Sequence, residues 1–116
     1  MPPAKYLFIV AMDVDPAHEA LFNEVYDNEH VPELLKVPGV VEVARLTKTP
    51  LRLGIGGEVK DVDTADKPHY MALYWIDSPD VLTSDAWGKA VETGRWPTHV
   101  RPHTSNRQHV LQKVMD

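Results

Sequence analysis

The chain has 116 residues, of which 43% are hydrophobic and 25% charged, as in one ordinary globular domain. Its 17 acidic residues outnumber its 12 basic ones, and the resulting net charge of −5 disfavours nucleic acid as a partner. It contains no cysteine, which excludes disulfides and a cysteine nucleophile and favours a cytoplasmic location. The longest apolar runs have the length of a strand, so we expect no membrane-spanning segment and no signal peptide.

The chain starts with a strand and an amphipathic helix. Residues 6–12 are continuously apolar, with aromatic and β-branched side chains, as in a buried central strand. Asp15 is a good N-cap, and Pro16 suits the first helical position, where no N–H is needed. Apolar residues then recur at helical spacing, which predicts a helix from about Pro16 to Asn28.

Pro32 complicates the end of this helix. It has no N–H and disfavours the α conformation of Val31, so we expect a kink or break around His30 and Val31. A short turn should follow and end at the Pro-Gly pair at 38–39. Residues 40–46 then form the second predicted strand.

Residues 50–67 have no clear periodicity. Their three glycines are not followed by the Lys-Ser or Lys-Thr pair of a phosphate-binding loop. We therefore expect a long hairpin or a mobile flap.

A second strand–helix unit follows. Residues 69–76 are rich in aromatic side chains and predict a third strand. The sequence Asp-Ser-Pro-Asp at 77–80 predicts the start of a second helix that runs to about Glu92, with Gly94 as its stop. Residues 83–85, Thr-Ser-Asp, offer a later start.

The C-terminal part should contain a loop over 95–104, which holds two prolines, and a fourth strand over 108–115. The order β-α-β-β-α-β predicts a single α+β domain over residues 1–116, with the ferredoxin-like arrangement of a four-stranded antiparallel sheet. Two helices cover only one face of such a sheet. Because the first strand is apolar on both faces, we expect a second copy to pack sheet against sheet as a homodimer.

Residues 22–35 read Phe-Asn-Glu-Val-Tyr-Asp-Asn-Glu-His-Val-Pro-Glu-Leu-Leu, and Val-Pro-Gly-Val follows at 37–40. This run resembles the first-helix motif of EthD-like dimeric α+β barrel proteins. The resemblance implies a ferredoxin-like fold over nearly the whole chain and two chains that form one barrel. At the level of residues it covers the first third and the region 85–87. The superfamily includes cofactor-independent monooxygenases, cyclases, isomerases, haem proteins and members without known activity, so the function stays open.

His30 is the first candidate catalytic residue. It lies one turn after Tyr26, on or beside the buried stripe, where a neutral imidazole can exchange a proton near neutral pH. Tyr26 can donate a hydrogen bond to an oxyanion, and Asp27 or Glu29 can orient His30. Alternatively, His30 is an inert cap of the broken helix, Tyr26 is a core residue, and the acids form a solvated face.

Candidate substrate-binding residues lie further along the chain. No acidic residue occurs between Glu92 and Asp116, and three arginines there can seat a carboxylate, phenolate or enolate. Pairing of these arginines with surface acids is the alternative. The tryptophans can wall a flat apolar ligand or serve as core or dimer contacts. The candidate substrate-binding residues are Tyr74, Trp87, Trp96, His99 and Arg101.

We expect neither a metal nor another cofactor. His99 and His103 have the spacing of a helical metal site, but Pro102 between them opposes a helix. Haem would need a histidine on the cavity wall, and we do not expect it.

The leading hypothesis is a cofactor-independent acid/base enzyme of the lyase, isomerase or cyclase type. Its substrate would be a small apolar aromatic or oxygenated compound of a degradative or secondary-metabolic pathway. One alternative is a non-catalytic ligand-binding or accessory protein, and another is a cofactor-independent monooxygenase. The sequence does not distinguish these functions or identify the substrate.

Overall fold

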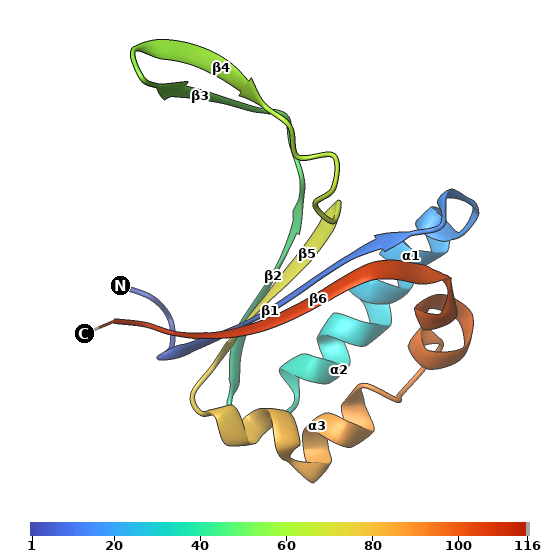
Figure 1. Ribbon diagram of the computed structural model, residues 1–116. Coiled ribbons are helices and arrows are strands. Elements are labelled where there is room, and N and C mark those ends of the chain that lie inside the picture. The colour runs from blue at the N-terminus through green and yellow to red at the C-terminus, as the bar shows by residue number, and fades with distance from the viewer. Residues whose placement is uncertain (116) are drawn as a thin grey trace.

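The computed structural model describes residues 1–115 and shows a four-stranded antiparallel sheet with helices on one face (Figure 1). The sheet has the strand order β2-β5-β1-β6. Its strands are β1 (Tyr6–Val14), β2 (Val40–Thr47), β5 (Tyr70–Ile76) and β6 (Thr104–Lys113). A separate hairpin consists of β3 (Leu51–Ile55) and β4 (Glu58–Val62). The predicted α+β, ferredoxin-like fold is confirmed.

The four strands of the sheet lie close to their predicted positions. Only β6 differs notably, because it begins at Thr104, four residues before the predicted Gln108. The central strand β1 pairs with β5 on one side and with β6 on the other, so that Val10 lies opposite both Ala72 and His109. Side chains alternate between the two faces of the sheet, and the helices cover the face of Val10.

The first helical segment continues where a break was expected. It comprises η1 (Pro16–His18), α1 (Glu19–Val25), η2 (Tyr26–His30) and α2 (Val31–Leu35). Of the expected kink or break, the break does not occur, because the α-helix is interrupted at this place by a π turn, η2, in which the N–H of Val31 donates to the carbonyl of Tyr26, five residues earlier. The wider turn makes room for the ring of Pro32, which lies in the first turn of α2. Val31 itself keeps helical angles, φ −62° and ψ −47°.

The second helical segment begins as a 3₁₀ turn, η3 (Pro79–Thr83), and its α-helix, α3 (Asp85–Ala90), starts later. Ser84 caps α3, since its hydroxyl accepts a hydrogen bond from the backbone N–H of Trp87 at 3.2 Å. The later of the two predicted starts is therefore confirmed. Gly94 follows the helix with φ +76°.

Residues 95–104 were expected to form a loop, and this prediction was wrong. The segment folds into η4 (Trp96–Val100), a π turn, and η5 (Arg101–His103), a 3₁₀ turn. Its two prolines did not prevent this, because each lies in the first two positions of a turn, where no N–H is required. Trp96 and Val100 are buried against the rest of the core.

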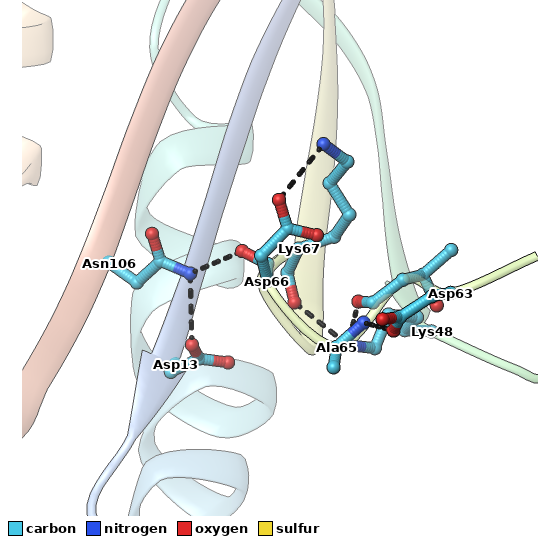
Figure 2. Close-up of polar contacts among 8 residues, drawn as sticks. Asp13, Lys48, Asp63, Ala65, Asp66, Lys67 and Asn106 are labelled. Carbon is cyan, nitrogen blue, oxygen red and sulfur yellow. Dashed lines mark hydrogen bonds and ion pairs between the residues drawn. The ribbon is translucent and has the colours of Figure 1, made fainter.

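The hairpin extends away from the sheet, and its base is fastened by polar contacts (Figures 1 and 2). Lys48 donates hydrogen bonds to the carbonyl oxygens of Thr64 (2.7 Å) and Lys67 (2.8 Å). Asn106 donates to Asp13 (3.1 Å) and to the carbonyl of Asp66 (3.2 Å). The predicted hairpin within residues 50–67 is thus confirmed, and all residues of its two strands are exposed.

None of the helices described over residues 1–115 has the length and hydrophobicity required to cross a bilayer.

Candidate active site

A cavity of about 330 Å³ lies between the helices and the covered face of the sheet. Most of its wall is apolar, and its aromatic members are Phe8, Tyr26, Tyr74, Trp87 and Trp96. Its basic members are His30, Arg101, Arg107 and His109. No acidic side chain of residues 1–115 lines it. The cavity therefore suits a small, mostly apolar molecule that carries oxygen or negative charge.

The π turn η2 places His30 in this cavity. The side chain is only 5% exposed, and its ring stacks on Trp96 with centroids 4.3 Å apart. The Tyr26 ring is also close, nearly perpendicular to the imidazole, at a centroid distance of 5.1 Å. The Nδ1 atom is buried and has no hydrogen-bond partner within residues 1–115. A buried polar atom without a partner is costly in a purely structural residue, and it is typical of a group that meets a ligand.

The surroundings of His30 keep its imidazole neutral. Burial, followed by the charges of Arg101 and Arg107, lowers the pKa of His30 from 6.5 to about 4. At neutral pH the ring can therefore accept a proton or a hydrogen bond, but it has no extra proton to give.

Tyr26 and Tyr74 form a buried pair of hydroxyl groups, 2.9 Å apart. Burial raises the pKa of Tyr26, and burial together with Tyr26 raises the pKa of Tyr74 well above its ordinary value. Both hydroxyls thus stay protonated. Because one of them donates to the other, one hydroxyl hydrogen is left to donate to a ligand oxygen.

The two arginines of the cavity are held differently. Arg101 donates to the carboxylate of Glu92 and to the carbonyl of Val91, both at 3.0 Å. Arg107 on β6 is exposed and forms no ion pair with any of residues 1–115. Beside it, burial and the charge of Arg107 lower the pKa of His109. Arg107 is thus the cation that a ligand can recruit without breaking an existing pair.

The structure brings six of the eight sequence-predicted site residues into this cavity. They are Tyr26, His30, Tyr74, Trp87, Trp96 and Arg101. Asp27 lies outside, where its carboxylate accepts a hydrogen bond from Arg45 at 2.8 Å. His99 is exposed, and its Nδ1 lies 2.7 Å from the hydroxyl of Thr98. Neither of these two residues contacts the cavity, and Glu29 binds Arg95 instead of His30.

The sequence analysis counted Arg107 among three arginines that can seat an anion but did not select it as a site residue, and it gave His109 no role. Both lie on the early part of β6, and alternation along that strand turns them toward the same face as Val10. The available signal was that Arg107 and His109 are two residues apart, so that on one strand they share a face. For Arg107 this inference required a strand that starts before it, as β6 does at Thr104. The predicted start at Gln108 left Arg107 in a loop.

No protein-family model and no curated protein matches the sequence. Among solved structures, the crystal structure of an ethyl tert-butyl ether D (EthD) family protein from Bacillus halodurans C-125 is similar to this chain, with a TM-score of 0.58. The similarity covers 95% of this chain and 99% of that one. The chain has an EthD-like fold. The sequence identity is 16%, so the EthD-like fold is shown and the reaction is not.

Within the EthD-like fold, the segment that resembled the first-helix motif forms α1, η2 and α2. The histidine of that motif, His30, is the one that faces the cavity. In this chain the motif therefore coincides with the π turn that places the His30 imidazole between helix and sheet.

Proposed function

We propose that this protein is a cofactor-independent acid/base enzyme of the lyase, isomerase or cyclase type. Its substrate is a small, largely apolar aromatic or oxygenated compound. The observation that carries the proposal is the buried imidazole of His30, without a hydrogen-bond partner for Nδ1 within residues 1–115, in the wall of a cavity that the Tyr26–Tyr74 hydroxyl pair also lines. These groups supply a proton acceptor and a hydrogen-bond donor in a mostly apolar site.

In the proposed mechanism His30 takes a proton from the substrate. Negative charge then develops on a substrate oxygen, and the free hydroxyl hydrogen of the Tyr26–Tyr74 pair stabilises it. Arg107 and Arg101, which both line the cavity, bind an acidic group of the substrate. The imidazolium is a strong acid in this environment, so it returns the proton to another atom of the product or to a leaving group.

The low pKa of His30 limits its strength as a base in the empty cavity. Two of the three causes of that low pKa are the charges of Arg101 and Arg107. An anionic substrate between these guanidinium groups would offset both charges and raise the pKa of His30 toward its ordinary value. Substrate binding would therefore activate the base.

The test is His30→Ala in a thermal-shift screen against small phenols, lactones, aldehydes and carboxylates, followed by rate measurements with each hit. We expect ligands that stabilise the wild type but not the variant, and a loss of at least about 100-fold in rate. His30→Phe keeps a ring against Trp96 and should be equally inactive. His99→Ala, which changes an exposed histidine outside the cavity, should behave as wild type. An active His30→Phe protein would contradict the proposal.

A non-catalytic ligand-binding role is the second candidate. It is favoured by the pKa of about 4, because a neutral imidazole is a good hydrogen-bond partner but a weak base. The two functions differ in turnover. Saturable stabilisation by a ligand that is recovered unchanged supports binding, whereas product formation with a steep dependence on pH supports catalysis.

A further inference from the structure

A second cluster of polar side chains lies outside the cavity. Asp15 follows β1, His18 belongs to η1 and His103 ends η5. One potential ligand atom of each residue lies within 4.8 Å of those of the other two. None of the three residues lines the cavity.

The geometry of the cluster is unusual for a surface. The rings of His18 and His103 lie face to face, with centroids 3.5 Å apart and planes inclined by 7°. The Nδ1 atom of His18 is buried and has no hydrogen-bond partner within residues 1–115, although a carboxylate oxygen of Asp15 is 3.5 Å away. Two imidazoles and a carboxylate thus converge: Asp15 Oδ1 accepts the N–H of Ala17 at 3.1 Å, and its Oδ2 is the atom 3.5 Å from His18 Nδ1.

The backbone around the cluster is already in place. The N–H of Asp15 donates to the carbonyl of His103 at 2.9 Å, which joins the end of β1 to the end of η5. Metal coordination requires each nitrogen or oxygen at about 2.0 to 2.2 Å, with the metal near the plane of each ring. The stacked rings must therefore rotate apart to bind one ion, and both belong to partly exposed side chains.

We propose that Asp15, His18 and His103 bind one divalent transition-metal ion of the Zn²⁺ class. Two imidazole nitrogens with one carboxylate oxygen suit Zn²⁺, Ni²⁺ and Cu²⁺, whereas Mg²⁺ and Ca²⁺ prefer oxygen ligands alone. Three protein ligands leave a fourth tetrahedral position for water. The sequence analysis considered only the pair His99 and His103 and predicted no metal site. In the structure the side chain of His99 lies against Thr98, and His103 lies against His18 instead.

The position of the cluster indicates what the ion would do. It would join η1 to η5, and η5 begins with Arg101, which lines the cavity. Because no ligand of the ion reaches the cavity, the ion braces the wall of the candidate active site and takes no part in proton transfer. This role does not depend on the reaction proposed above.

The experiment uses full-length protein without a histidine tag, treated with a chelator and then titrated calorimetrically with Zn²⁺ or Mg²⁺. We expect about one Zn²⁺ per chain, a higher melting temperature with Zn²⁺, and no effect of Mg²⁺. Co²⁺ should give the visible absorption of a tetrahedral site. Absence of stoichiometric Zn²⁺ binding would overturn the proposal.

Variants assign the ligands. His103→Phe keeps the stacked ring, and Asp15→Asn keeps an N-cap side chain, so both should fold. Each should weaken Zn²⁺ binding at least about tenfold. His99→Ala removes a neighbouring exposed histidine and should leave binding unchanged. Wild-type affinity in both His103→Phe and Asp15→Asn would show that the bound ion is elsewhere and would also overturn the proposal.

Discussion

At the scale of single residues, His30 combines two properties that packing alone does not require. It is buried among aromatic rings, and its Nδ1 makes no hydrogen bond with residues 1–115. Trp96 holds the ring by stacking, and Tyr26 holds it from the edge. These aromatic contacts offset the cost of the unpartnered nitrogen and hold the imidazole in the wall of the cavity.

His30 should also make the fold sensitive to acid. Its pKa is about 4 in the folded chain and 6.5 when unperturbed, so the unfolded chain binds more protons between these values. The contribution of neutral His30 to the free energy of unfolding is fully present above pH 6.5 and is lost as the pH falls toward 4. The loss should amount to roughly 3 kcal/mol. Urea unfolding of wild type and His30→Phe across this range measures it.

The matched comparison separates His30 from other groups. His109 also has a lowered pKa and contributes in the same direction, and it is unchanged in His30→Phe. The difference between the two proteins therefore reports on His30 alone. Equal pH dependence in both proteins would mean that His30 is not held neutral by the fold.

The sequence correctly predicted which side chains face the core where helical spacing alone determines it. Tyr26 and His30 are one turn apart, and this placed both on the buried side. It failed for Asp27, whose partner Arg45 comes from β2, because sequence does not reveal which distant cation meets a given acid. Arg107 was named among the C-terminal arginines but not selected for the site, since its orientation depends on the exact start of β6.

At the scale of elements, the expected and observed structures differ mainly in the segments that contain prolines. Pro32 was expected to kink or break a helix, and the 95–104 segment, with Pro97 and Pro102, was expected to be a loop. In all three places the chain instead places proline near the start of a new turn, in two cases together with a π turn. Periodicity was enough for strands such as 6–12, but the choice between α and π turns depends on tertiary packing.

The turn before β2 provides a test at this scale. Gly39 has φ +95°, and a Cβ atom there would overlap Val81 and lie 2.8 Å from the carboxylate of Asp77. Gly39→Ala should therefore lower the free energy of unfolding by about 2 to 4 kcal/mol, from backbone strain and overpacking. Gly88→Ala within α3 is the control, because a Cβ atom there meets no atom within 4 Å. It should stabilise the protein by about 0.5 to 1 kcal/mol in the same urea titration.

A smaller loss for Gly39→Ala than for Gly56→Ala would contradict this explanation. Gly56 also has a positive φ, of +61°, but its surroundings are open. The comparison of these two variants therefore isolates the effect of the contacts with Val81 and Asp77.

At the scale of the whole molecule, the face of the sheet opposite the helices has no cover within residues 1–115 (Figure 1). Ile9 of β1 lies directly between Leu73 of β5 and Val110 of β6, so an apolar row crosses three strands of this face. Trp75 extends the apolar area along β5. Such a face favours a second copy packed sheet against sheet, as the resemblance to dimeric α+β barrels implied.

We therefore predict that the protein is a homodimer, measurable by size-exclusion chromatography with light scattering. Leu73→Glu places a charge in the apolar row and should give a folded monomer. Leu35→Glu, on the exposed side of α2, should leave the dimer intact. A monomeric wild type at micromolar concentration would refute the prediction.

The arginines of the cavity have a further consequence because the chain as a whole carries a net charge of −5. A negatively charged ligand is repelled at long range and attracted only after it has come close to Arg107. Dissolved salt screens the distant repulsion more than the interaction within the cavity, so ligand capture should become faster as ionic strength rises. We therefore expect the protein to exclude anions in general and to retain those whose apolar part fits the aromatic walls.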